Sequence, residues 1–554
     1  MKKIISILLI VCTLFSVVAC GGKNSDGSKN NSNEKPSVAA NITSYATHSY
    51  NKIIANIKPK GNLSSDYTVY MTRGETEGCQ LVIYSDQAVK KVELVTVSGE
   101  NESITTEFFS MNNTHKIGGK QYTDSTFPYG KKDISLEVKK SLSFVIDFKT
   151  TADTPAGEYK YVFAINDASG KKSVQLATYN VTVHVWDIVL PEEKTFATSA
   201  GINTYHIGRF YGGGCGPALY KQFYDMLLEH NICAHTLPYD ILDSRADEYM
   251  SDPRVTSFVV PSAPDDLSDE EILAYYNKLK QNPEWLKKAI FYPIDEPSTK
   301  EDLAKYKEHC ERLKRLAPEI PVISPFYTNI QMEEGKDQVD FMDPYTDLWC
   351  PKLCLWDDSQ SYDPFLDYTP NKTFADRMAE MQSEGDRMWA YVCNDPIDPY
   401  AQLFINTAGV EQRLMMWQHY QRNIEGFLYW GTTAWGYKTN EQTTYNNIDP
   451  WETTFNGVRD GNGSPVYGEG FLFYPAGLDM RMFEPVSSIR MKILRDGIDD
   501  IEFFYVAENA LGKEWVMNYV NQATPTLTSY VTNEQFANIR IEMGNAVEAA
   551  LKNK

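Results

Sequence analysis

The 554-residue sequence predicts a multidomain α and β protein. An N-terminal antiparallel β-sandwich is expected to be followed by a (β/α)8 TIM-like barrel with a helical C-terminal extension. Two observations predict this architecture. Residues 45–190 consist of short β-rich segments separated by turns, with almost no helical periodicity. After about residue 195, strand-like and helix-like segments alternate, which is typical of parallel βα units.

The first residues are typical of an export signal rather than of a fold. Two lysines precede an apolar stretch, residues 4–18, that is too short for a comfortable membrane span. The stretch ends in Ala19-Cys20, which resembles the cleavage box of a bacterial lipoprotein. Residues 1–19 are therefore predicted to be a lipoprotein signal peptide, with an ordinary signal peptide or an uncleaved anchor as alternatives. We expect an extracytoplasmic protein that is lipid-anchored to the bacterial membrane through Cys20.

The remaining chain is predicted to divide into four parts. Residues 20–40 are rich in Ser, Asn, Gly and Lys, a composition that cannot bury a core, so they are expected to form a flexible tether. The rest is too long for one ordinary domain. The domains predicted after the tether are the β-sandwich (41–192), the (β/α)8 barrel (193–510) and a C-terminal helical extension (511–554).

The strands of the sandwich are expected at β-branched and aromatic runs. Asp153–Gly157 is a strong turn signal between two of them, and Pro191 marks a plausible end of the domain. The runs are Tyr67–Tyr70, Gln80–Tyr84, Val92–Val95, Leu142–Ile146, Tyr159–Ile165 and Tyr179–Trp186.

The barrel is expected from eight strands with helices between them. A doubly wound open sheet is the alternative, but no Gly-rich phosphate loop supports it. A further helix is expected from about Ser487, and another over residues 533–552. The strands are expected near Phe196–Ile202, Ile232–Thr236, Thr256–Val260, Ala289–Ile294, Pro321–Ser324, Asp347–Pro351, Met388–Val392 and Gly426–Trp430.

Charge and cysteine content limit the partners. The formal net charge of −21 argues against nucleic acid, because phosphate binding needs a basic surface. Beyond Cys20, the cysteines of the mature chain are odd in number and scattered, which makes a poor disulfide framework. Cys350 and Cys354 have no second Cys or His pair at a suitable spacing, so no metal site and no cofactor are expected. The oligomeric state is not predicted.

The strongest candidate for chemistry is the acid pair Asp295 and Glu296. It ends the fourth predicted barrel strand, and active sites of such barrels lie at the C-terminal ends of the strands. Pro297 forces a turn, so both carboxylates could reach one cavity. Two close carboxylates repel, so one stays protonated and supplies an acid beside a base. The alternative is a helix N-terminus, where both acids would favour the helix dipole and Ser298 or Thr299 would cap.

Other predicted strand ends carry groups that suit a sugar. Aromatic faces stack on pyranose rings, and amides and imidazoles bond to hydroxyls, although each residue could instead belong to the core. The candidates are His235 after the second strand, Tyr327 and Asn329 after the fifth, Tyr391 and Asn394 at the seventh, and Trp430 and Trp435 at the eighth.

A family resemblance becomes specific at the acid pair. The string Tyr292-Pro293-Ile294-Asp295-Glu296-Pro297 resembles the catalytic segment of glycoside hydrolase family 123 and of related proteins that share its Asp-Glu-Pro segment. Further segments resemble the family in order along the chain. They are Arg73–Gln80, Val183–Asp187, Trp389–Cys393, Gly426–Trp430, Asp449–Trp451, Gly468–Pro475 and Ile489–Gly497.

The resemblance implies an activity. It implies a retaining exo-hydrolase that releases terminal β-linked N-acetylgalactosamine from glycans through the sugar's own 2-acetamido group, one of the substrate-assisted exceptions to the two-carboxylate scheme. Asp295 would orient and stabilise the acetamido group, and Glu296 would protonate the leaving oxygen and then activate water. Two alternatives remain open: a glycosidase for another sugar, or a non-catalytic glycan-binding lipoprotein. The intact acid pair favours an enzyme.

Overall fold

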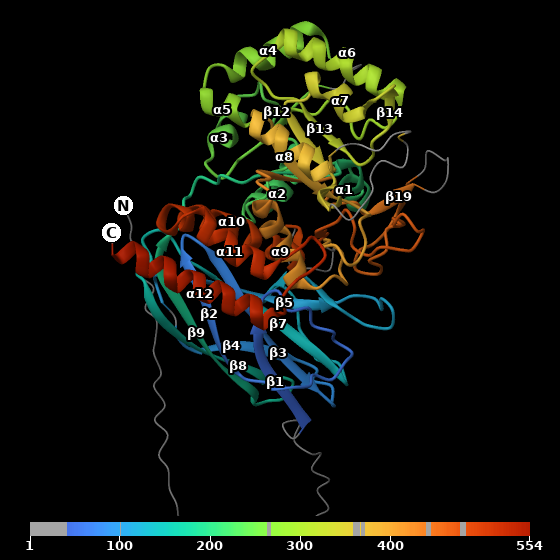
Figure 1. Cartoon of the computed structure of the whole chain (residues 1–554). Helices are drawn as coiled ribbons and strands as arrows, with labels where there is room; N and C mark the ends of the chain where they lie inside the picture. Colours follow the sequence, from blue (N-terminus) through green and yellow to red (C-terminus); the bar gives the residue numbers. More distant parts are fainter. Residues whose placement is uncertain are drawn as a thin grey trace, which may run out of the picture.

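The computed structural model describes residues 41–99, 101–262, 267–357, 366, 372–438, 445–476 and 484–553. The predicted signal peptide and tether, including Cys20, lie outside the described residues. In Figure 1 the N-terminal strands occupy the lower half, and the segment in which strands and helices alternate occupies the upper half. The helices α10 and α11 lie between them. No helix in the described part of the chain is both long enough and apolar enough to cross a membrane.

Two β-sheets share one apolar core in the N-terminal region. Among the described residues, the larger sheet has the strand order β1-β3-β7-β5-β6-β22-β21, and the smaller has the order β2-β9-β8-β4. The prediction of an antiparallel β-rich region is confirmed, with the difference that β2 and β9 run parallel. The strands are β1 (Ile42–His48), β2 (Asp66–Arg73), β3 (Thr76–Ser85), β4 (Val92–Ser98), β5 (Thr105–Asn113), β6 (Thr123–Pro128), β7 (Lys140–Lys149), β8 (Gly157–Asp167), β9 (Val174–Val189), β21 (Phe473–Tyr474) and β22 (Val486–Ser488).

The interior strand β7 shows why the larger sheet is buried on both faces. Successive side chains of a strand point to opposite faces. Phe144 and Ile146 therefore enter the core between the two sheets, whereas Val145 joins the core on the other side. Asp147 also points to that second side and bonds there to Lys492 of α10 at 2.7 Å. The outer face of the sheet is thus a platform for the C-terminal part of the chain.

Parallel strands follow the β-rich region. In the described part of the chain they form a five-stranded sheet, β10-β18-β17-β16-β13, and a pair, β11-β12. Single parallel bridges, Ala200 to Ala234 and Phe291 to Val322, connect the two sets, and the Val259 amide donates to the His235 carbonyl at 2.7 Å. The strands are β10 (Ala197–Ala200), β11 (Phe258–Val260), β12 (Ala289–Phe291), β13 (Ile323–Phe326), β16 (Leu348–Pro351), β17 (Arg387–Val392) and β18 (Gly426–Tyr429).

Helices alternate with these strands, as the sequence predicts. Short antiparallel pairs occur in the connections: β14 (Gln331–Glu333) with β15 (Lys336–Asp337), and β19 (Gly436–Lys438) with β20 (Tyr445–Asn447). The helices are α1 (Thr204–Tyr211), α2 (Pro217–Leu228), α3 (Ala246–Ser251), α4 (Asp269–Leu279), α5 (Pro283–Lys288), α6 (Lys300–Leu316), α7 (Gln338–Met342), α8 (Phe374–Glu384), α9 (Gly409–Gln421), α10 (Ile489–Leu511), α11 (Lys513–Ala523) and α12 (Asn533–Lys552).

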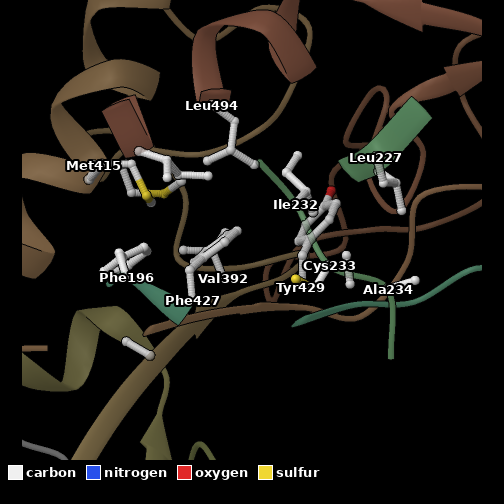
Figure 2. Close-up of a cluster of buried hydrophobic side chains, with 14 of the residues drawn as sticks. Phe196, Leu227, Ile232, Cys233, Ala234, Val392, Met415, Phe427, Tyr429 and Leu494 are labelled. Carbon is white, nitrogen blue, oxygen red and sulfur yellow. The ribbon is translucent and has the colours of Figure 1, made fainter. Parts of the chain in front are cut away.

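Figure 2 shows how the strands and helices pack. Phe427 of β18 and Val392 of β17 face Met415 of α9 and Leu494 of α10. Both helices are buried on nearly all sides, which is typical of helices in the centre of a large protein. The α9–α10 pair therefore forms a middle layer, with parallel strands on one side and the platform of the larger sheet on the other.

The C-terminal helix α12 packs against the N-terminal β-rich region rather than the parallel strands (Figure 1). The Trp186 indole of β9 donates to Asn545 Oδ1 at 2.9 Å, and a Cβ at Gly544 would lie 2.3 Å from that ring. Arg540 of α12 and Arg413 of α9 both bond to the buried Asp500 of α10, each at 2.7 Å. Helix α12 therefore contacts both the β-rich region and the α/β region.

Candidate active site

A sharp turn after β12 places the predicted acid pair. Glu296 has a φ of 44°, in the left-handed region that a non-glycine residue adopts only at a cost in energy. Pro297 follows and disfavours a helical conformation at Glu296. Helix α6 begins later, at Lys300, with the Thr299 hydroxyl accepting from the Asp302 amide at 3.1 Å. The acids thus precede the helix cap and do not form it.

Both acids line one cavity of about 230 Å³ at the ends of the parallel strands. It contains three of the predicted binding residues, Tyr391, Asn394 and Trp430. This clustering supports the expectation that a bent strand end can aim neighbouring carboxylates at one space. The lining residues are Tyr292, Asp295, Glu296, Pro325, Tyr391, Cys393, Asn394, Leu428, Trp430, Val458 and Glu469.

Each acid is held by a tyrosine. The Tyr292 hydroxyl donates to Asp295 Oδ1 at 2.7 Å, and the Tyr391 hydroxyl donates to Glu296 Oε1. Burial raises the pKa of both tyrosines well above the usual range, and the neighbouring carboxylates add to the rise. Both phenols are therefore neutral donors near pH 7, and each fixes the direction of one carboxylate.

The two acids differ in environment. Asp295 is exposed, whereas Glu296 is half-buried. Burial raises the pKa of Glu296 above its usual range, the hydrogen bond from Tyr391 opposes that rise, and the Asp295 carboxylate adds to it. A carboxyl with a raised pKa is suited to donate a proton near neutral pH. The environment of Glu296 therefore suits a proton donor.

His235 lies behind this arrangement and does not line the cavity. Its Nδ1 is 2.7 Å from the Ser199 hydroxyl, and its ring meets the Tyr292 ring edge-on with centroids 5.9 Å apart. Burial lowers the pKa of His235 to about 4, so the imidazole is neutral at pH 7. His235 packs against the side of Tyr292, and Tyr292 in turn bonds to Asp295.

Trp430 presents an aromatic face to the cavity. Trp430 directly follows β18 and is 41% exposed. The indole Nε1 donates to the carboxylate of Glu469, and Gly470 packs against the ring so closely that a Cβ there would lie 2.1 Å from Cζ2. The ring is thus fixed along one edge and supported on one side.

Glu469 is a cavity-lining acid that the sequence analysis did not identify as one. It is completely buried and accepts hydrogen bonds from Trp430 and, at 3.2 Å, from the Tyr429 hydroxyl. Burial raises the pKa of Glu469 to about 7, against the effect of both donors. The signal was present in the string Gly468-Glu469-Gly470, where an acid stands between two glycines with φ of 79° and 69°.

Of the other predicted binding residues, only Asn394 lines the cavity, and its amide nitrogen donates to the Arg459 carbonyl at 2.7 Å. Tyr327 borders a neighbouring hollow. Asn329 is buried, and its side chain bonds to Asp337 and to the Gln338 amide, so it organises the start of α7. Trp435 is only 1% exposed and donates to the Phe473 carbonyl at 3.0 Å, in the core.

The described cysteines are all free thiols, and most are buried. Among the described residues, no group of three or more His, Cys, Asp and Glu side chains could hold a metal ion.

Residues 269–507 match the family model described as glycoside hydrolase 123, catalytic domain. The chain also resembles a solved family 123 glycoside hydrolase from Clostridium perfringens, studied for glycolipid glycan hydrolysis, with a TM-score of 0.61 and 15% identity over 92% of this chain and 98% of that one. At that identity the likeness establishes the fold. A β-glucuronidase from Bacteroides uniformis has a TM-score of only 0.26 at 10% identity, covering 71% of this chain and 48% of its own. No curated protein matches. The family resemblance inferred from the sequence is confirmed.

Proposed function

Since this chain carries a family 123 glycoside hydrolase catalytic domain over residues 269–507, we propose that it is a retaining exo-β-N-acetylhexosaminidase. Its proposed reaction releases terminal β-linked N-acetylgalactosamine from glycans by substrate-assisted catalysis. One observation carries the proposal: Asp295 and Glu296 line the same cavity, and each is oriented by its own tyrosine.

The roles follow from the environments of the two acids. The acetamido oxygen of the bound sugar attacks C1, and the bond to the leaving oxygen breaks as Glu296 donates its proton to that oxygen. Asp295 stabilises the positive charge that develops on the resulting oxazolinium ring. Glu296, now a carboxylate, takes a proton from the water that opens this ring and returns to its acid form. Since the sugar supplies the nucleophile, no enzyme carboxylate is needed across the ring.

The exposed ring of Trp430 supports the assignment to a sugar. An aromatic face that is fixed along one edge and open to the cavity is suited to stack on the apolar face of a pyranose. The buried Glu469 carboxylate behind it fixes the orientation of the ring. Tyr391 has a different task in this scheme, since its hydroxyl is committed to Glu296.

A panel of aryl β-glycosides tests the proposal. The chain without the predicted signal peptide should hydrolyse the N-acetylgalactosaminide fastest, and NMR should detect the β-anomer as the first product. Preference for a sugar without a 2-acetamido group would establish a glycosidase of another kind. Binding of an intact glycan over hours without product would establish a glycan-binding protein instead.

We also propose that the ring of parallel pairings is a (β/α)8 barrel. The bridges at Ala200–Ala234 and Phe291–Val322 bring the strand order back to its starting point. In the proposed barrel, the segment around Ala234 is the second of the eight strands. An experimental structure with an open edge between β12 and β13 would contradict it.

The location of the enzyme is a further proposal. Ala19-Cys20 after an apolar stretch supports acylation at Cys20 and anchoring outside the cytoplasm. Labelling with a radioactive fatty acid should mark the full chain, and Cys20→Ala should abolish the label. Retention of the label in that variant would place the acylation elsewhere.

A further inference from the structure

A second hollow of about 340 Å³ adjoins the catalytic cavity. The same two chain segments border both spaces. Asn394 and Val458 line the catalytic cavity, and their near neighbours in sequence, Asp395 and Gly461, line the second hollow. A substrate whose terminal sugar occupies the catalytic cavity would therefore find its next residue beside this hollow.

An aromatic ring is held at the wall of the second hollow. Tyr327 is 40% exposed, and the ammonium group of Lys352 lies 5.0 Å from the centre of its ring. Lys352 is itself almost fully buried and paired with Asp395. Its backbone forms a parallel bridge with Tyr391, which links the hollow to the residue that orients Glu296. The ring of Tyr327 is thus kept in place by a fixed cation.

The charges of the second hollow favour a neutral ligand. Two carboxylates, Asp395 and Asp398, line it together with one ammonium group, Lys352, which Asp395 already neutralises. Asn462 adds an amide that can bond to hydroxyls. An anionic group would meet the uncompensated Asp398 carboxylate, whereas sugar hydroxyls could donate to it.

We propose that the second hollow is the subsite for the leaving group, where a neutral hexose stacks on Tyr327 and donates hydroxyl hydrogen bonds to the carboxylates. This inference rests on the proposed function, because it places the scissile bond between the two spaces. Tyr327, predicted from the sequence as a binding residue, would then contact the second sugar and not the terminal one. Lys352 acts through Tyr327 and is a positioning residue.

Two substrates that share a terminal sugar test the subsite. One is the β-azide of that sugar, whose leaving group is too small to reach the hollow, and the other is a disaccharide with a neutral hexose as the leaving group. Tyr327→Ala should lower kcat/KM for the disaccharide about fivefold to tenfold, the range expected for a lost stacking contact, and leave the azide unchanged. An equal loss on both substrates would overturn the proposal.

A matched control is Tyr345→Ala. Tyr345 also lies under a lysine, Lys307, whose ammonium group is 5.5 Å from the ring, but it borders neither space. For both substrates, the kcat/KM of this variant should equal that of the wild type. If it reproduces the selective loss of Tyr327→Ala, the effect is structural and the subsite is refuted.

Binding measurements separate the subsite from the proposed activity. Calorimetry with Glu296→Gln should find tighter binding of the disaccharide than of the free terminal sugar, and adding Tyr327→Ala should remove that difference. This result would hold even if the wild type hydrolysed neither substrate, in which case the proposed function alone would fail. A disaccharide with a hexuronic acid as the second residue should bind more weakly than the neutral disaccharide. Asp398→Asn should reduce this difference in affinity. Equal binding of both disaccharides to Glu296→Gln would refute the neutral preference.

Discussion

The hydroxyl of Tyr391, at the end of β17, donates a hydrogen bond to Glu296, which follows β12. A donor aimed at a carboxylate stabilises its ionised form, so Tyr391 counteracts the burial that raises the pKa of Glu296. The tyrosine therefore sets the pH range in which Glu296 carries a proton. It also limits the rotamers that the carboxyl can adopt.

Tyr391→Phe should move the alkaline limb of the kcat/KM profile to higher pH. The general acid must be protonated in the first step, so that limb reports its loss of a proton. Without the Tyr391 donor the carboxylate is less stable, the pKa of Glu296 rises further, and the acid persists to higher pH. Tyr292→Phe is the matched control, because its hydroxyl bonds to Asp295. A shift of the alkaline limb to lower pH in Tyr391→Phe would contradict this account.

Trp430 and Trp435 provide a second comparison, since they are five residues apart but differ in burial. Trp430→Ala should lower kcat/KM about fivefold to tenfold and leave a cooperative thermal transition, because one face of the ring is exposed in the cavity. Trp435→Ala should cost about 3–5 kcal/mol of unfolding free energy, because its ring is fully buried against Phe210 and Phe223. Calorimetry and kinetics on both variants check the pair. Loss of the cooperative transition in Trp430→Ala would show that this ring is also part of the core.

These two tryptophans also show what the sequence could predict. The order of β-rich and alternating segments follows from local periodicity, and the β-rich region and the family resemblance are confirmed. Burial at a single strand end depends on residues far along the chain. Trp435 donates a hydrogen bond to the Phe473 carbonyl, and Asn329 donates one to Asp337, and a local pattern reveals neither partner. The addition of β21 and β22 to the larger sheet is a long-range pairing of the same kind.

Glu469 should make the stability of the enzyme depend on pH near neutrality. Its folded pKa of about 7 lies above the usual value of an unfolded glutamate, so the folded state binds the extra proton. Its contribution to stability is fully present below the unfolded pKa, near 4.3, and is lost as pH rises through about 7. Glu469→Gln remains neutral throughout. The Tm of Glu469→Gln should therefore rise relative to the Tm of the wild type as pH increases from 5 to 8.

A second glutamate separates this effect from catalysis. Burial also raises the pKa of Glu411 to about 7, but Glu411 lines a different hollow and makes no contact with Trp430. Glu411→Gln should show the same trend in Tm with an unchanged KM. Glu469→Gln should in addition raise KM, because the amide cannot replace both acceptor oxygens that fix Trp430 and Tyr429. A Tm difference that does not change with pH would contradict the assigned protonation of Glu469.

Glu296 and Asp295 should respond differently to substitution, because their proposed tasks differ. Glu296 is proposed to protonate the leaving oxygen, and a nitrophenolate leaves with little help from a proton. Glu296→Gln should therefore retain more activity on nitrophenyl glycosides than on natural glycans, by a contrast of about 10²–10⁴-fold. Asp295 is proposed to stabilise an oxazolinium that forms with any leaving group, so Asp295→Asn should be impaired on both substrates. A thiazoline analogue of that intermediate should inhibit the wild type and bind Asp295→Asn more weakly. Equal losses of both variants on both substrates would remove the basis for the two roles, and an inverted first product would exclude the substrate-assisted mechanism itself.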